Sequence, residues 1–157
     1  MNRNRRSQKA EVASLDPVPA VSKPARHRAL LVEDHAALAE ATAELMRSQG
    51  LEVRVATTGR AALAMAGEFK PALIVCDIML PDMTGLDLGQ ALRAERGAND
   101  LLIAVVSAMS AVDLRDIEHE WKPRGIDVFL SKPLTNETLI GLVSKLEGHW
   151  RLRSDVV

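Results

Sequence analysis

The sequence predicts an α/β fold, a doubly wound sheet of five parallel strands with five helices covering its two faces. Three observations support this expectation. From Ala29 onward, apolar runs of strand length alternate with segments of helical period. The runs 72–76 and 101–106 are apolar throughout, as in strands buried on both faces. Parallel strands need long, right-handed crossover connections, and the helical segments can form them.

The first two strands are predicted at residues 29–32 and 51–55. The run 29–32 is fully apolar, whereas residues 51–55 alternate apolar and polar side chains as a half-buried strand does. Between them, Leu38, Ala41 and Leu45 recur at helical spacing. We therefore expect a helix here that buries this face.

The middle of the chain continues the alternation. Residues 58–69 form an Ala-rich segment of helical length, and Pro71 opens the buried strand 72–76. A further helix is predicted at about residues 86–95. The apolar run 101–106 then supplies the fourth strand.

The last helix pair and the last strand complete the domain. One helix begins at the capping-box pattern Ser110-Ala-Val-Asp113. Residues 126–130 are the fifth strand, and a final helix follows it. The predicted buried stripe of that helix consists of Leu139, Leu142, Val143 and Leu146.

Length and charge describe one domain with short flanking segments. The 157 residues are 47% hydrophobic, which suffices for a single core. Residues 1–28 hold seven Lys or Arg against two acidic residues, while the remainder holds thirteen against nineteen. The basic, Pro-bearing head lacks large aromatic residues, so we expect residues 1–27 to be a disordered tail. The predicted domain covers residues 28–148, and residues 149–157 form a short C-terminal tail.

Several classes of protein are disfavoured by the composition. The apolar runs are far shorter than the roughly 20 residues of a membrane span. Cys76 is the only cysteine, which rules out an internal disulfide and a cysteine-based zinc site, and it is expected to be buried filler. The head lacks the apolar stretch of a secretory signal, although its Arg-rich character leaves an organelle transit peptide open. A cytoplasmic location is the expectation.

Polar residues stand at the ends of four predicted strands. Glu33 and Asp34 end the first strand, Asp77 the third, Ser107 the fourth, and Lys132 follows the fifth. In doubly wound sheets functional groups gather where the carboxyl ends of strands meet. Three carboxylates there repel by about 4 kcal/mol for each pair 4 Å apart at an effective dielectric of 20, so cations are required.

The ligand types indicate which chemistry the site performs. Carboxylate oxygens suit Mg²⁺ or Mn²⁺, and Lys132 supplies a second, fixed cation. A divalent ion, a lysine and a hydroxyl around one carboxylate are typical of phosphoryl transfer. Taken singly, the residues have plainer explanations, since Glu33 and Asp34 could cap the next helix and Asp82 could be an ordinary loop residue. Their occurrence together favours the site.

Four motifs carry a resemblance to a known family, and each contains a predicted strand end. They are LLVEDH, VCDIMLPDMTGLDL, VVSAMS and DVFLSKPL. Together they make residues 28–148 resemble the receiver domains of response regulators in bacterial two-component systems, including the single-domain chemotaxis type. The resemblance implies a flavodoxin-like strand order of 2-1-3-4-5.

The resemblance also implies a role for each acidic residue. Asp77 would be the nucleophile that takes a phosphoryl group from a phosphohistidine and becomes an acyl phosphate. Glu33, Asp34 and Asp77 would hold Mg²⁺ (or Mn²⁺) together with the backbone carbonyl of Met79. Such a protein is a signalling phosphoacceptor, not an enzyme, because it catalyses only its own phosphotransfer and dephosphorylation.

The remaining implied roles concern the response to phosphorylation. Lys132 would pair with Asp77 or its phosphate, and Pro133 would follow a cis peptide bond. Ser107 would move toward the phosphate, and Phe129 stands where the family carries its aromatic switch residue. Phe129 lacks a tyrosine hydroxyl, so the switch would work by burying a ring in the space that Ser107 vacates.

The implied partners are proteins. A histidine kinase or histidine phosphotransfer protein would supply the phosphoryl group, and a downstream target would bind the face made by the fourth helix, fifth strand and fifth helix. Within that face Trp121 lies in an unusually long connection and is either a contact residue or a half-buried residue in a longer loop. A homodimer is left open. No DNA-binding or other output domain fits after the final helix.

The remaining expectations concern the lifetime of the phosphoryl group and two alternative functions. Met79 and Met109 flank the phosphate position with apolar side chains, which predicts slow autodephosphorylation because such flanks orient water poorly. A receiver-like interaction module that needs no phosphorylation is one alternative. A dehalogenase-type metal-dependent phosphohydrolase is a second, but it needs another Asp where Met79 stands.

Overall fold

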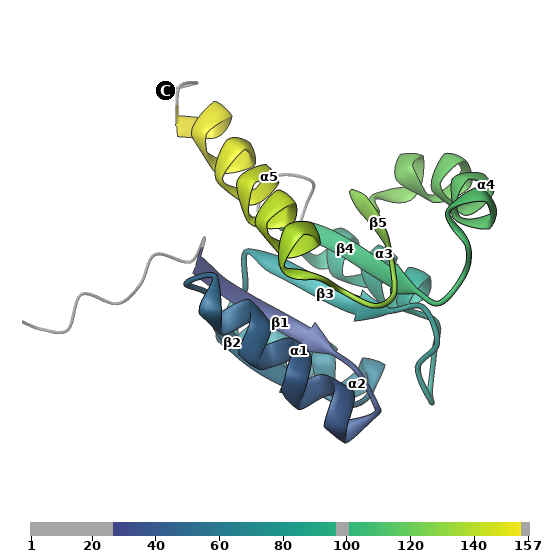
Figure 1. The fold of residues 1–157 in the computed structure, drawn as a ribbon, viewed down its shortest axis with the longest axis horizontal. Coiled ribbons are helices and arrows are strands. Elements are labelled where there is room, and N and C mark those ends of the chain that lie inside the picture. The colour runs from purple at the N-terminus through teal and green to yellow at the C-terminus, as the bar shows by residue number, and fades with distance from the viewer. Residues whose placement is uncertain (1–26, 97–100, 155–157) are drawn as a thin grey trace, which may run out of the picture.

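The computed structural model describes residues 27–96 and 101–154 and confirms the predicted fold (Figure 1). Its five parallel strands have the order β2-β1-β3-β4-β5. The strands are β1 (Arg28–Val32), β2 (Glu52–Ala56), β3 (Leu73–Asp77), β4 (Leu102–Ser107) and β5 (Val128–Ser131). The helices are α1 (Ala36–Ser48), α2 (Gly59–Phe69), α3 (Gly85–Arg96), α4 (Ala111–Trp121), the 3₁₀ helix η2 (Lys122–Arg124) and α5 (Asn136–Ser154). The tail expected at residues 1–27 lies outside the described residues, except for His27.

The core has two halves because successive side chains of each strand point to opposite faces of the sheet. On one face Leu31 and Val75 pack with side chains of α1 and α5. On the other face Leu30 and Ile74 pack with α2, α3 and α4. Figure 1 shows α1 and α5 in front of the sheet, with α2 and α3 behind it. None of the described helices is long and apolar enough to cross a membrane.

The buried face of α1 differs from the predicted one. The sequence favoured a face made by Leu38, Ala41 and Leu45, and this was wrong: Leu38 is 38% exposed, Ala41 is exposed and Leu45 is only partly buried. The buried stripe is Ala39, Ala43 and Met46. The small side chains of Ala39 and Ala43 bring α1 close to the sheet. Packing against the sheet therefore decides which face of α1 is buried, and the spacing of the leucines alone does not reveal this face.

Helix α5 is longer than predicted. The sequence predicted that the domain ends at Gly148 and that a tail follows. Helix α5 instead continues to Ser154, so residues 149–154 are helical. A glycine inside a helix costs only about 1 kcal/mol. Trp150 extends the apolar stripe and packs against the core beyond Gly148. Near this end, His27 Nε2 lies 3.4 Å from Glu147 Oε1.

The connection from α4 to β5 is helical where the sequence suggested a longer surface loop. Trp121 ends α4, η2 follows at once, and Gly125 turns the chain with a φ of 101°. The Trp121 side chain is half-buried and packs against the core, with the Arg124 guanidinium 4.9 Å from its ring centre. Arg93 of α3 fastens the turn, because its guanidinium donates to the carbonyls of Gly125 and Leu101 and pairs with Asp127.

Candidate functional site

The predicted acidic residues and the lysine meet at the C-terminal edge of the sheet. Oxygen atoms of Glu33, Asp34 and Asp77 all lie within 4.8 Å of one another. Lys132 Nζ lies 2.6 Å from Asp77 Oδ2 and 3.1 Å from Glu33 Oε2. Glu33 is buried, Asp77 is half-buried and Asp34 is exposed, so the cluster opens to solvent on one side.

Strand register explains why residues so far apart in the sequence converge. Val32 pairs with Cys76 in the sheet, so the residues after β1 lie beside the end of β3. Ser107 pairs with Ser131, and Lys132 N donates to Ser107 O at 2.7 Å. The peptide bond between Lys132 and Pro133 is cis.

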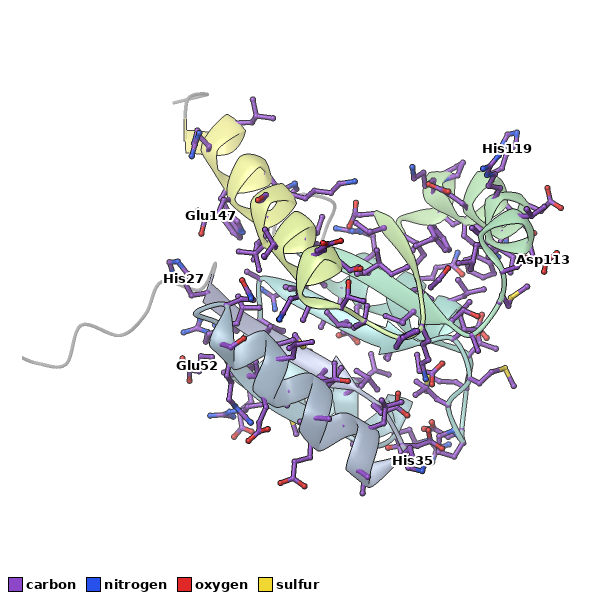
Figure 2. All side chains as sticks on the ribbon, in the orientation of Figure 1. His27, His35, Glu52, Asp113, His119 and Glu147 are labelled. Carbon is purple, nitrogen blue, oxygen red and sulfur yellow. The ribbon has the colours of Figure 1, made fainter. Side chains whose placement is uncertain are left out.

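Glu33 and Asp34 were also candidates for capping the helix that follows them. The N-cap of α1 is instead His35, whose Nδ1 accepts from the amide of Leu38 at 3.4 Å. Glu33 Oε1 accepts from His35 N at 3.1 Å, while its Oε2 accepts from Lys132. Figure 2 labels His35 at this edge of the sheet. Glu33 therefore links the lysine to the start of α1 rather than capping the helix.

The electrostatics of the cluster keep Lys132 charged. Partial burial lowers the pKa of Lys132, but its hydrogen bonds to Asp77 and Glu33 outweigh that effect and raise the pKa above its ordinary value. Burial raises the pKa of the Cys76 thiol far above its usual range, and the charges of Asp77 and Glu33 add to this. The thiol stays protonated, in keeping with a packing role.

The loop between β3 and α3 is closed beneath Asp77. Met79 N donates to Asp77 Oδ1 at 3.2 Å, Met79 forms an antiparallel bridge with Thr84, and Gly85 N donates to Ile78 O at 2.7 Å. A Cβ atom on Gly85 would stand 2.1 Å from Asp77 O. Only glycine fits there. The sequence pattern did not single out this residue, although it belongs to the VCDIMLPDMTGLDL motif.

Asp82, for which the sequence suggested an ordinary loop position, lies at the tip of this loop. Its carboxylate accepts from Gly59 N at 2.8 Å and from Arg60 N at 2.9 Å. The hydrogen bonds from these backbone amides, that of Arg60 most and then that of Gly59, lower the pKa of Asp82. Local sequence holds no signal for this contact, because its partners precede Asp82 by more than 20 residues.

Comparison with known proteins identifies the family. The model of the response regulator receiver domain matches residues 29–144. The chain belongs to the response regulator receiver domain family. Receiver domains are phosphoacceptor signalling domains, not enzymes in the ordinary sense.

The curated relatives are longer proteins. The receiver is 32% identical over 118 residues to the DNA-binding response regulator MtrA of Mycobacterium tuberculosis, covering 75% of this chain and 49% of that protein. It is 37% identical over 142 residues to the aerobic respiration control sensor protein ArcB of Escherichia coli, covering 88% of this chain and 16% of that protein. The chain thus spans about half or less of these relatives.

Solved structures support the same assignment. The signal receiver domain of a putative Luxo repressor protein from Vibrio parahaemolyticus has a TM-score of 0.71 and 28% identity, covering 83% of this chain and 97% of that one. The chemotaxis response regulator CheY4 of Vibrio cholerae has a TM-score of 0.67 and 26% identity, covering 76% and 97%. The match favours a receiver over the phosphohydrolase alternative.

Two hollows of the receiver meet at Lys132. One is an open pocket of about 490 Å³ above Asp77, which Met79, Ser107 and Met109 also line. The other, of about 320 Å³, lies on the α1 side and is mainly apolar. Its lining includes Leu31, Leu38, Val75, Val106 and Leu134. The first hollow leaves open space beside the Asp77 carboxylate.

The two predicted switch residues lie on neighbouring strands. Ser107 is buried at the end of β4, where its Oγ accepts from Met109 N at 3.1 Å. Phe129 is half-buried on β5 and packs against the core on the α3 and α4 side. In this structure the Ser107 hydroxyl is thus engaged by its own loop, not by Asp77.

Proposed function

We propose that the receiver accepts a phosphoryl group on Asp77 from a phosphohistidine of a histidine kinase or histidine phosphotransfer protein. The observation that carries this proposal is the environment of the Asp77 carboxylate. One oxygen accepts from Lys132 Nζ and the other from the amide of Met79, and an open pocket lies above them. The carboxylate is therefore oriented at both oxygens and accessible to a donor.

Phosphoryl transfer here needs orientation and charge neutralisation more than covalent assistance. A carboxylate oxygen of Asp77 forms a bond to phosphorus, the phosphorus–nitrogen bond of the donor breaks, and the imidazole leaves with the bonding electron pair. Lys132 stays protonated and balances negative charge on the phosphoryl oxygens. The product is an acyl phosphate.

The charge of the cluster fits a divalent cation. Three carboxylates against one ammonium leave two uncompensated negative charges among the oxygens of Glu33, Asp34 and Asp77. We infer that these residues and the carbonyl of Met79 would hold Mg²⁺ or Mn²⁺, whose preferred ligands are oxygens. Such an ion would supply charge neutralisation to the incoming phosphoryl group.

The output that we propose is a change of shape read by a protein partner. Ser107 Oγ would leave the Met109 amide and bond to a phosphoryl oxygen, and the Phe129 ring would move into the space that it leaves. Ser107 ends β4 just before the connection to α4, and Phe129 lies on the neighbouring strand β5, so the change would reach the face formed by α4, β5 and α5. A downstream protein or a second copy of the chain would bind this face.

Intact-protein mass spectrometry tests the proposal. The receiver is incubated with Mg²⁺ and a small phosphodonor, next to the variants Asp77→Asn and Asp116→Asn, the latter altering an exposed carboxylate on α4. We expect one added phosphoryl group on the wild type and on Asp116→Asn, and none on Asp77→Asn or with chelator present. Equal labelling of all three proteins would refute Asp77 as the acceptor. No adduct with any donor, phosphohistidine proteins included, would favour the phosphorylation-independent interaction module.

A further inference from the structure

The backbone of Met79 contributes to the site, but the exposed Met79 side chain does not hold that backbone in place. Met79 N donates to Asp77 Oδ1 at 3.2 Å, and the carbonyl of the same residue is the proposed metal ligand. The Met79 side chain is 72% exposed. The position of this backbone must therefore be fixed by other parts of the loop.

The base of the loop is fixed by its own backbone. The bond from Gly85 N to Ile78 O and the bridge between Met79 and Thr84 close it. Residues 80–83 form the tip of the loop beyond these contacts, where Leu80 and Met83 are partly buried against the core. A loop held only at its base would still be free to pivot about Ile78 and Gly85, carrying Met79 with it.

The tip is fastened to α2 by two side chains. The Asp82 carboxylate spans the first two amides of the helix, at 2.8 Å from Gly59 N and 2.9 Å from Arg60 N. A negative charge is favourable there because these amides lack partners within the helix and carry the positive end of its dipole. Met83 lies against Gly59 so closely that a Cβ atom at Gly59 would stand 2.4 Å from Met83 Cγ.

We propose that Asp82 is a positioning residue that anchors the β3–α3 loop to α2, so that the Met79 backbone keeps its place beside Asp77. The anchor thereby raises the affinity of the site for Mg²⁺ and the rate at which Asp77 accepts a phosphoryl group. This inference rests on the proposed function. It assigns a role in the site to a side chain that contacts neither the metal ligands nor the phosphoryl group.

The test compares Asp82→Ala with a matched control, Thr58→Ala. Thr58 Oγ1 accepts from Ala61 N at 3.0 Å, so its loss also weakens the start of α2 but leaves the loop anchor in place. Mg²⁺ affinity is measured by isothermal titration calorimetry on the unphosphorylated proteins, after thermal denaturation has shown that each is folded. We expect about 10-fold weaker Mg²⁺ binding in Asp82→Ala, the usual cost of losing an outer support of a metal site. Thr58→Ala should bind Mg²⁺ as the wild type does.

A third variant, Asp82→Asn, adds a graded result. Its amide oxygen can accept from one helix amide, whereas its NH₂ group has only hydrogens to offer the other. We expect Mg²⁺ affinity between those of the wild type and Asp82→Ala. The rate of labelling by the small phosphodonor at saturating Mg²⁺ should follow the same order.

Each outcome decides the matter. Wild-type Mg²⁺ affinity in Asp82→Ala would overturn the proposal, and so would equal weakening in Asp82→Ala and Thr58→Ala, because the effect would then belong to α2. If the wild-type protein itself neither binds Mg²⁺ nor accepts a phosphoryl group, the proposed function fails and the anchor has no site to serve. The wild-type titration separates that failure from failure of the anchor alone.

Discussion

Replacing Lys132 with methionine should destabilise the receiver most when divalent cations are absent. Methionine keeps the aliphatic stem of the side chain, so the change removes mainly the ammonium. Without it, the carboxylates of Glu33, Asp34 and Asp77 have lost the cation that the structure places among them. Mg²⁺ supplies positive charge to the same oxygens, and its addition should recover part of the lost stability.

The size of the effect follows from the geometry. Nζ of Lys132 lies 2.6 Å from Asp77 Oδ2 and 3.1 Å from Glu33 Oε2. At an effective dielectric of about 20, each contact attracts by roughly 5 to 6 kcal/mol, but desolvation offsets much of this gain. Removing one partner of a buried pair costs about 3–5 kcal/mol in proteins. The Lys132 side chain is 25% exposed, which places the expected loss near the lower end of that range.

Urea unfolding followed by the fluorescence of Trp121 and Trp150 measures the change. The variant Lys122→Met is the matched control, because Lys122 Nζ lies 2.6 Å from Glu118 Oε1 in a pair whose side chains are 52% and 35% exposed. Such a surface pair contributes only about 0.3–0.5 kcal/mol. If Lys132→Met with chelator present loses no more stability than Lys122→Met, the reasoning is refuted.

The same comparison has a defined pH dependence. The pKa of Lys132 is raised above its ordinary value of 10.5 in the folded protein. Its charge therefore contributes fully to stability below pH 10.5, and the contribution disappears as the pH rises through the higher folded pKa. The stability difference between wild type and Lys132→Met should be constant near neutral pH and shrink in strong alkali. A difference that vanishes near pH 8 would contradict this.

Three further predictions concern Gly85 in the β3–α3 loop, the hydrogen bonds of Arg93 and the lifetime of the phosphoryl group. Gly85→Ala should lower the melting temperature and abolish labelling, because its Cβ would collide with Asp77 O. Gly67→Ala is the control, since a Cβ there meets open space, and it should raise the free energy of unfolding by about 0.5–1 kcal/mol. Labelled Gly85→Ala with wild-type stability would contradict the loop geometry. Arg93→Lys keeps the positive charge but loses the guanidinium that donates to the carbonyls of Gly125 and Leu101. The free energy of unfolding measured in urea should fall by about 1.5–3 kcal/mol. An unchanged unfolding midpoint would show that these hydrogen bonds are dispensable. Polar residues at both Met79 and Met109 should shorten the lifetime of the acyl phosphate in a mass-spectrometric time course, and a wild-type lifetime of seconds would contradict slow autodephosphorylation.

The sequence could place the acidic cluster because strand ends are visible as changes from apolar to polar residues. Once the strands are parallel, Asp34, Asp77 and Lys132 lie at one edge of the sheet, and the strand order that the family resemblance implies places β1 beside β3 there. The face of α1 was harder to predict, since it depends on how closely the helix approaches the sheet. Leu38 has the right spacing for a core residue, but it borders an apolar hollow instead.

Two side-chain anchors were invisible in the sequence for a different reason. Asp82 accepts hydrogen bonds from amides at the start of α2, more than 20 residues earlier in the chain. Arg93 donates to the carbonyl of Gly125, more than 30 residues later. Backbone amides and carbonyls are present at every position, so residue type gives no sign of which ones a side chain will reach. Such contacts become apparent only when the loops are placed in space.

The overhang of α5 has a practical consequence. Its 19 residues extend about 28 Å, whereas a five-residue strand extends about 17 Å, so the helix runs past the edge of the sheet where His27 meets Glu147. Figure 2 labels these two residues at the edge opposite His35, and therefore opposite Asp77. A fluorophore or a surface tether attached at either described end would stand clear of an approaching phosphodonor. The receiver could thus be immobilised there without covering the site around Asp77.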